Sequence, residues 1–336
     1  MKLLVCITPG TFAYTTDVTP VAGKNETLLR IKRIGICGTD LHAFEGTQPY
    51  FQYPRILGHE LAAEIITTEA EGFTAGEAVT IIPYFNCGTC VACRKGKPNC
   101  CAKINVCGVH VDGGMREYLV VPDYSLVKSE GLSWDELALV EPLAIGAHAI
   151  RRAAVEKDDF VLVLGAGPIG LGTMEFARIA GAKVIAMDIN PQRLAFCKEK
   201  LGVAHTVNAL DADVAEQIKN ITNGDMADVV IDCTGNLKAI NGMINYLAHG
   251  GRAVLVGLQK EDFAFNHPEF HKRESTLMSS RNATREDFIH VVQSMKNALV
   301  NPATYITHRL DFDNVKDEFK DLLNPANGVI KAMIEL

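Results

Sequence analysis

The densest group of metal-binding side chains in the sequence is a run of cysteines. Six of the ten cysteines lie between Cys87 and Cys107. Two-residue gaps let successive thiolates converge on one ion, and four thiolates close a tetrahedral structural zinc site. The first residues lack the long apolar stretch of an export signal, which favours metal binding over disulfides. We therefore predict a structural zinc, with Cys100 competing for the fourth place, held by Cys87, Cys90, Cys93 and Cys101.

A second group of potential zinc ligands lies nearer the N-terminus. Cys37 begins the segment Cys-Gly-Thr-Asp-Leu-His42, and Gly58-His59-Glu60 follows an apolar stretch. Cysteine and histidine are common zinc ligands, and glutamate can be one. Three protein ligands with one open position form the arrangement of a catalytic zinc. The second group therefore predicts an open zinc site beside the closed one.

A glycine-rich turn follows the apolar, strand-like run Phe160–Leu164 and opens a helical stretch. In this context Gly165 permits the tight turn, Gly167 lets the backbone approach a pyrophosphate, and Gly170 allows the helix to pack closely on the strand. The positive end of the helix then faces the phosphates. The turn predicts a dinucleotide site whose loop consists of Gly165, Ala166, Gly167, Pro168, Ile169 and Gly170.

Acidic and small residues at the ends of later strands extend this site. Asp188 ends the next strand 23 positions after Gly165 (188 − 165), where a carboxylate accepts hydrogen bonds from the adenosine ribose and repels a 2′-phosphate. This favours NAD over NADP, although Arg193 could meet such a phosphate. The nicotinamide half should lie at the carboxyl edge of the sheet, beside Thr234, Val256 and Gly257.

Two kinds of secondary structure must position these groups. Residues 1 to about 145 contain short β-type runs at Thr27–Arg33, Glu64–Thr68, Ala78–Ile82 and Glu117–Val121. After Asp159, apolar strands alternate with helical stretches, which predicts a parallel sheet. Its strands should lie at Phe160–Leu164, Lys183–Asp188, Val229–Cys233 and Ala253–Leu258. A helix at Arg285–Lys296 and a strand within Val329–Leu336 complete the chain.

Composition excludes several classes of protein. The 336 residues are 48% hydrophobic and 22% charged, the balance of a folded chain with a sizeable core. The net charge of −7 argues against nucleic-acid binding, which needs clustered cations. The longest apolar runs are too short to span a membrane. We therefore expect a cytoplasmic protein with a small-molecule substrate and neither a nucleic-acid nor a membrane partner.

The order of these motifs resembles that of the zinc-dependent medium-chain alcohol and polyol dehydrogenases, over essentially the whole chain. The pair Glu141-Pro142 resembles the polyol, sorbitol-type branch, in which a carboxylate replaces the second thiolate of the catalytic site. The resemblance implies an α/β fold with three segments. These are a mostly β, GroES-like catalytic domain over residues 1–145 with the zinc lobe at about 85–105, a Rossmann NAD domain with a doubly wound parallel sheet over 146–282, and a C-terminal segment over 283–336 that returns to the catalytic domain.

The same resemblance implies roles for individual residues. Cys37 and His59 would bind the catalytic zinc, with Glu60 and Glu141 as competing third ligands or water-mediated neighbours. Asp40 would orient His59. Thr39 and His42 would relay the substrate proton to solvent, and Arg281 would border the cofactor.

Three further segments, His267–Glu274, Ser279–Thr284 and Gln48–Arg55, look most like those of bacterial L-galactonate and L-gulonate 5-dehydrogenases. Those enzymes oxidise the C5 hydroxyl of a sugar acid, whose carboxylate needs a cation. The candidate cations besides Arg281 are Arg55, Lys272 and Arg273.

Alternatives to this substrate remain open. Sorbitol-type polyols and L-threonine, which related enzymes oxidise, are alternative substrates. A zinc-stabilised, dinucleotide-sensing protein without catalysis is the alternative of another class. The family also implies a homodimer or homotetramer, with Ala253–Leu258 as a candidate edge for pairing two sheets.

Overall fold

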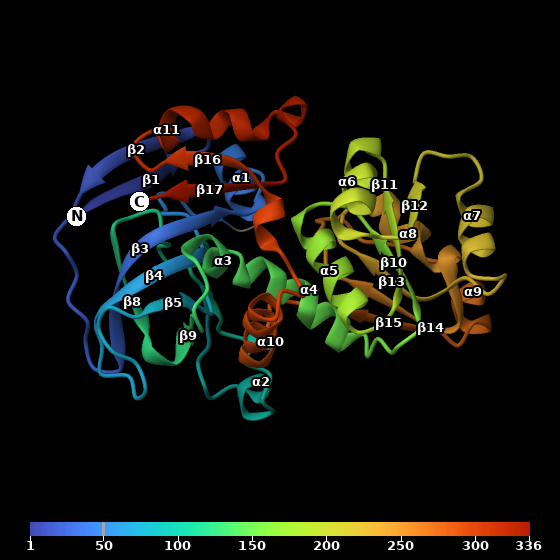
Figure 1. The fold of residues 1–336 in the computed structure, drawn as a ribbon, viewed down its shortest axis with the longest axis horizontal. Helices are drawn as coiled ribbons and strands as arrows, with labels where there is room; N and C mark the ends of the chain where they lie inside the picture. Colours follow the sequence, from blue (N-terminus) through green and yellow to red (C-terminus); the bar gives the residue numbers. More distant parts are fainter. Residues whose placement is uncertain (49–50) are drawn as a thin grey trace. The chain divides into compact units, whose positions relative to one another are not determined.

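The computed structural model describes residues 1–48 and 51–336, which divide into two compact units (Figure 1). Unit 1 comprises Met1–Pro142 and Ala283–Leu336, and unit 2 comprises Leu143–Asn282. The domain boundaries expected from the sequence, after residues 145 and 282, lie beside the ends of these units. Pro49 and Tyr50, part of the segment Gln48–Arg55, lie outside the described residues.

Unit 1 is built on a largely antiparallel seven-stranded sheet. Its order is β16-β17-β3-β4-β5-β9, and β8 also pairs with β3. The long strand β3 buries Leu29, Ile31 and Ile34, which anchor the core of the unit. The strands are β3 (Glu26–Ile36), β4 (Glu60–Thr67), β5 (Ala78–Ile81), β8 (Tyr118–Pro122), β9 (Leu126–Lys128), β16 (Ile306–Asp311) and β17 (Lys331–Glu335). The β runs predicted for this part of the chain are confirmed.

Shorter elements surround this sheet. Two small sheets pair β1 (Lys2–Thr8) with β2 (Thr11–Thr16), and β6 (Tyr84–Phe85) with β7 (Asn105–Val106). The predicted helix α10 (Arg285–Lys296) is confirmed to the residue, and Thr284 and Asp287 form a capping box at its start. The other helices are α1 (Gly38–Glu45), α2 (Val91–Arg94), α3 (Trp134–Ala138) and α11 (Val315–Glu318).

Unit 2 is a parallel sheet of six strands in the order β12-β11-β10-β13-β14-β15. Its central strands are apolar and buried, as strands covered on both faces require. The strands are β10 (Phe160–Leu164), β11 (Lys183–Asp188), β12 (His205–Asn208), β13 (Ala227–Asp232), β14 (Leu247–Leu255) and β15 (Thr276–Ser279). The helices are α5 (Pro168–Ile179), α6 (Pro191–Leu201), α7 (Val214–Ile221), α8 (Leu237–Gly242) and α9 (His267–Lys272), preceded by α4 (Val140–Arg152), which begins in unit 1.

The edge expected at Ala253–Leu258 is wrong. Residues 252–255 of β14 pair with β13 on one side and with β15 on the other. The sequence pattern missed β15 because that strand is short and partly polar, so the apolar β14 looked like the last strand of the sheet. The free edges of this sheet, within the described residues, are β12 and β15.

Across residues 1–48 and 51–336, no helix combines the length and apolar character needed to cross a membrane.

Candidate active site

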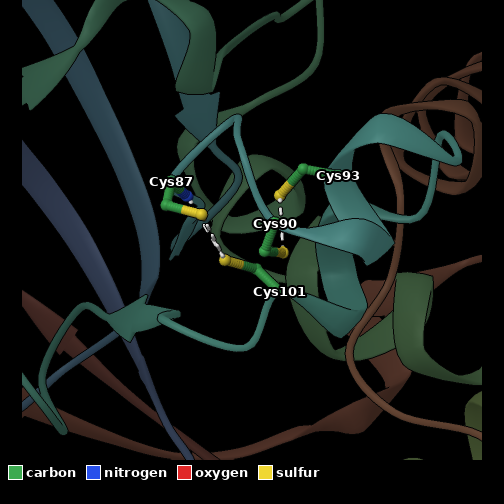
Figure 2. Close-up of side chains that lie close together, drawn as sticks. All are labelled: Cys87, Cys90, Cys93 and Cys101. Atoms are coloured by element: carbon green, nitrogen blue, oxygen red, sulfur yellow. Dashed lines mark hydrogen bonds between the residues drawn. The ribbon is translucent and has the colours of Figure 1, made fainter.

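The four predicted thiols of the cysteine lobe lie together (Figure 2). The Sγ atoms of Cys87, Cys90, Cys93 and Cys101 are all within 4.8 Å of one another. Cys87 Sγ is 3.4 Å from Cys101 Sγ, and Cys90 Sγ is 3.5 Å from Cys93 Sγ. Cys90 is the N-cap of α2 and Cys93 lies within that short helix, so one helical turn brings both thiols to the same point.

Hydrogen bonds around the lobe lower the pKa of Cys87 and Cys90 and so favour their thiolates, whereas burial raises the pKa of Cys93 to about 11. The backbone N–H groups of Cys87 and Lys103 donate to Cys101 Sγ, each at 3.3 Å. Hydrogen bonds from the backbone and the hydroxyl of Thr89 lower the pKa of Cys87 to about 6. Cys100 is exposed and outside the group, so the geometry favours Cys101 as the fourth member. The lobe fits a closed zinc site with four sulfur ligands.

The second group is largely buried: His59 and Glu60 are buried, and Cys37 is half-buried. Ligand atoms of Cys37, His59 and Glu60 also lie within 4.8 Å of one another. Cys37 follows β3, and Glu60 begins β4, where it pairs with Gly35 across the antiparallel ladder. A Cβ atom on Gly35 would lie 3.1 Å from Glu60 Cδ, so the glycine makes room for this carboxyl group. Strand pairing therefore brings together residues that are more than twenty positions apart.

Asp40 connects the two loops that carry these side chains. Its Oδ2 accepts from Cys37 N–H at 2.9 Å, and its Oδ1 accepts from Gly58 N–H at 3.0 Å. The expected hydrogen bond to His59 is absent: Nδ1 of His59 lies 3.8 Å from Asp40 Oδ1 and is a buried atom with no hydrogen-bond partner among the described residues. Asp40 thus fixes the backbone around the site, and the imidazole retains a free coordinating or hydrogen-bonding position.

A buried lysine that the sequence patterns did not identify completes this group. Lys331 Nζ lies 2.6 Å and 2.7 Å from the two carboxylate oxygens of Glu60 and donates to Ile36 O at 3.1 Å. Lys331 is 2% exposed and Glu60 is 0% exposed. Burial is the largest single influence and lowers the pKa of Lys331, but the charges of Glu60 and Cys37 and the hydrogen bond to Glu60 together outweigh it. The pKa of Lys331 is therefore raised, and the lysine stays charged. The sequence feature that could have identified Lys331 is its position as a lysine at the start of an otherwise apolar strand.

Glu141 lies at the start of α4 and is also buried. It accepts a hydrogen bond from the Tyr84 hydroxyl. Burial raises the pKa of Glu141 to about 7, with Glu60 adding a further upward contribution. A thiol, an imidazole and two carboxyl groups thus share one buried region with Lys331, a donor set that suits a divalent cation such as zinc.

The two predicted relay residues both lie in α1. Thr39 is half-buried, next to the turn that holds Cys37, whereas the side chain of His42 is 61% exposed. His42 Nδ1 is 3.1 Å from Thr47 Oγ1 and 3.6 Å from Glu45 Oε2. His42 is thus placed to exchange protons with solvent.

In unit 2 the glycine-rich turn has the expected form. Gly165 has a φ of 96°, and Gly167 is the N-cap of α5, with Pro168 and Ile169 in its first turn. A Cβ atom on Gly170 would overlap the Gly165 carbonyl group, so the close packing predicted for this glycine is present. The backbone N–H groups at the start of α5 face the loop, which suits a pyrophosphate.

The adenosine side of the predicted site is tied to this loop. Asp188 Oδ2 accepts from Ala166 N–H at 2.7 Å, and Asp188 Oδ1 accepts from Asn190 N–H at 2.8 Å. Arg193 donates to Ala166 O at 3.1 Å. Asp188 and Arg193 therefore both contact the turn that would receive the dinucleotide.

On the other side of β10, the strand ends of β13 and β14 carry Thr234, Val256 and Gly257. The N–H groups of Val256 and Gly257 donate to Asp232 O at 2.9 Å and 3.0 Å, which joins the two turns. These residues lie at the carboxyl edge of the sheet, as expected.

Among the predicted substrate cations, Lys272 and Arg273 lie elsewhere. Arg273 pairs with Glu269 and donates to Leu247 O, at the amino end of β14. Lys272 lines a cavity of about 700 Å³ together with Glu274 and Thr276, at the amino end of β15. Ligands of such sheets bind at the opposite, carboxyl edge, so this placement argues against a role for either residue in substrate binding.

The other two predicted cations, Arg55 and Arg281, lie in different units. Arg55 pairs with Asp112 at 3.2 Å, while its buried Nε has no hydrogen-bond partner in the described structure. Arg281 follows β15 at the carboxyl edge and is exposed.

Comparison with known proteins gives the family. Residues 23–131 match the alcohol dehydrogenase GroES-like domain, and residues 168–297 match the zinc-binding dehydrogenase domain. The chain is 42% identical to L-galactonate-5-dehydrogenase of Escherichia coli (strain K12), over 99% of this chain and 98% of that protein. It is 32% identical to a sorbitol dehydrogenase of Halalkalibacterium halodurans, over 92% of each.

A solved structure agrees. The crystal structure described as a short chain alcohol dehydrogenase (rspB) from Escherichia coli CFT073, in complex with NADH, superposes with a TM-score of 0.92 at 29% identity, covering 100% of this chain and 99% of that one.

These matches confirm the resemblance and the fold class, and they favour an enzyme over the non-catalytic alternative. The chain belongs to the zinc-dependent medium-chain alcohol and polyol dehydrogenase family and is an oxidoreductase that uses zinc and NAD.

Proposed function

We propose that this enzyme oxidises the C5 hydroxyl of L-galactonate or L-gulonate to the corresponding keto sugar acid. The identity to L-galactonate-5-dehydrogenase along nearly the whole chain carries the proposal. The buried group of Cys37, His59 and Glu60 supplies a site at which a hydroxyl could ionise. A bound zinc would supply Lewis acidity there, and NAD would accept the hydride.

We assign two zinc ions to each chain, one in the cysteine lobe and one in the buried group. Glu60, rather than Glu141, is the third protein ligand in this proposal, because its carboxylate lies with Cys37 and His59 while Glu141 is held by Tyr84. Lys331 offsets the Glu60 charge, so that the ligand set stays less negative and favours a developing negative charge on the substrate oxygen.

The remaining side chains handle protons and the substrate carboxylate. The Thr39 hydroxyl would accept the substrate proton while giving up its own, and the relay would end at His42, whose exposure allows it to release a proton to solvent. Arg55 and Arg281 are the proposed carboxylate anchors, and Arg55 has an unused buried N–H to offer. Arg55→Gln should raise KM for the sugar acid and leave KM for sorbitol unchanged; an equal rise for both substrates would exclude Arg55 as the anchor.

We further propose that Asp188 selects NAD over NADP through the adenosine ribose. Asp188→Ser should shift the ratio of kcat/KM for the two cofactors toward NADP. An unchanged ratio would rule out this assignment.

The proposal also includes a homodimer or homotetramer. Strand β15, at a free edge of the sheet in unit 2, is the candidate edge for pairing two sheets. Light scattering would measure the mass of the assembly.

The substrate is tested by following NADH formation at saturating NAD with L-galactonate, L-gulonate, sorbitol and L-threonine, each with and without a zinc chelator. We expect the largest kcat/KM for one of the two sugar acids, and loss of activity on chelation. Activity on sorbitol or L-threonine without activity on either sugar acid would overturn the proposed substrate and leave the enzyme class unchanged.

A further inference from the structure

Asp232 is a buried carboxylate for which the structure provides no cationic partner. It is the last residue of β13 and is 0% exposed. None of the ion pairs within residues 1–48 and 51–336 involves it, and burial raises its pKa. Buried carboxylates without a cation are costly, so their presence calls for an explanation.

Both oxygens of this carboxylate are used by the turn that follows β13. Oδ1 accepts from the hydroxyl of Thr234 at 2.5 Å and from its backbone N–H at 3.2 Å, and Oδ2 accepts from Gly235 N–H at 3.1 Å. Thr234 Oγ1 in turn accepts from Asn236 N–H at 2.9 Å. Asp232 therefore fixes the conformation of the whole turn 233–236.

The neighbouring turns pack directly on this one. A Cβ atom on Gly257 would lie 2.8 Å from Asp232 Oδ2 and 2.7 Å from Gly235 Cα. A Cβ atom on Gly165 would lie 2.8 Å from Thr234 Cγ2. The glycine-rich turn and the turns after β13 and β14 thus meet around the Asp232 carboxylate.

The strand order places this junction in the second half of the sheet. In the order β12-β11-β10-β13-β14-β15, Asp188 ends β11 on one side of β10, and Asp232 ends β13 on the other. In sheets of this order the adenosine half of a dinucleotide binds beside the first three strands, and the nicotinamide half binds beyond the switch point.

We propose that Asp232 is a positioning residue for the nicotinamide ring of NAD: through Thr234, Gly235 and Gly257 it holds the turns on which that ring binds. The proposal rests on NAD binding by unit 2 and goes beyond it, because it assigns a role to a side chain that does not itself face the cofactor. Asp188, the proposed partner of the adenosine half, ends β11 on the other side of β10, so we expect binding of that half to depend little on Asp232.

The test compares NADH with ADP-ribose, which lacks only the nicotinamide ring. Asp232→Asn preserves size but replaces one acceptor oxygen with an amide donor, which would face an N–H group of the turn. We expect the affinity for NADH, measured by fluorescence titration, to fall about tenfold. The affinity for ADP-ribose, measured by calorimetry, should stay within about twofold.

Two further variants make the result decisive. Asp188→Asn, the matched control, should weaken both ligands. Thr234→Val removes one of the three hydrogen bonds to Asp232 and should produce a smaller loss, of about threefold, for NADH alone. If Asp232→Asn does not fold, Thr234→Val tests the proposal in its place.

Equal losses for NADH and ADP-ribose would mean that Asp232 only stabilises the domain, and an unchanged affinity for NADH would mean that it has no role; either result overturns the proposal. Failure of the wild-type protein to bind NADH would instead contradict the NAD site itself.

Discussion

The cysteine lobe and the buried group around Cys37 are both candidate zinc centres, but they are built in different ways. The lobe takes its four thiols from residues 87–101, a single short segment with one helical turn. The buried group takes Cys37 from the end of β3, His59 and Glu60 from the start of β4, and Lys331 from β17. One centre is local and partly exposed, whereas the other depends on the pairing of three strands.

The difference separates a centre that stabilises from a centre that can react. In the lobe, neighbouring N–H groups face the sulfur atoms, and four equivalent ligands leave no open position. In the buried group the ligands are of different types, and the carboxyl group of Glu141 lies near them. Lys331 offsets the negative charge of Glu60. Loss of either centre should therefore have distinct effects.

The largest expected effect is on catalysis, from a change at the buried centre. Cys37→Ser should lower kcat/KM by at least about a thousandfold, because Lewis acidity at the substrate oxygen is worth several kcal/mol. Circular dichroism and the zinc of the lobe should be unchanged. Cys100→Ser, an exposed thiol outside both groups, serves as the control, and retention of full activity by Cys37→Ser would remove the distinction between the two centres.

The next largest effect is on stability. Lys331→Met leaves the Glu60 carboxylate buried without its partner, which should lower the free energy of unfolding by about 3–5 kcal/mol. Urea denaturation measures the loss. Lys331→Arg keeps the charge and should lose less, and the double variant with Glu60→Gln should recover much of the stability. A loss below about 1 kcal/mol in Lys331→Met would show that the pair behaves like a surface ion pair.

A change in the lobe should have a more limited consequence. Cys93→Ser removes one of four sulfur ligands, so the lobe should lose its zinc while the ligand group at Cys37 remains intact. We expect a lower melting temperature and kcat within about tenfold of the wild-type value, since the lobe takes no part in the chemistry. Elemental analysis measures the zinc, a thermal melt the melting temperature, and steady-state kinetics the kcat. A loss of activity as large as that of Cys37→Ser would show that the two centres are not separable.

The smallest expected effect concerns surface ion pairs on β3 and β16, the two strands that flank β17. Asp135 pairs with Arg33 of β3 and Arg309 of β16, and hydrogen bonds from Arg309 lower its pKa. A carboxyl group with a lowered pKa stabilises the fold above its unfolded pKa near ~3.9, and this stability is lost as the pH falls through the folded pKa.

Asp135→Asn should therefore reduce stability by less than about 1 kcal/mol at pH 7, and the difference from wild type should shrink as the pH falls below the unfolded pKa. Thermal melts from pH 7 down to pH 3 measure it. A difference that persists or grows at low pH would contradict this assignment.

The sequence predicted the local features well. Regular thiol spacing identified the lobe, the strand followed by a glycine-rich turn identified the dinucleotide loop, and apolar runs identified β10 and β11 at their observed bounds. In each case the relevant contacts lie within about two dozen residues. Local patterns are enough when neighbouring residues make the site.

Long-range contacts were harder to predict. Nothing near Lys331 in the sequence indicates that β17 pairs with β3 and delivers this lysine to Glu60, because that pairing depends on the core of the whole unit. The edge assigned to Ala253–Leu258 was wrong because β15 is too short and polar to stand out. Lys272 and Arg273 were chosen by charge, while the fold places them at the amino edge of the sheet.

Zinc content, measured by elemental analysis of the purified protein and of Cys37→Ser and Cys93→Ser, tests most directly whether the two centres are separate metal sites with separate roles. We expect two ions per chain in the wild-type protein and one in each variant, with catalysis lost only in Cys37→Ser. One ion per chain in the wild-type protein, or two in Cys37→Ser, would contradict the account.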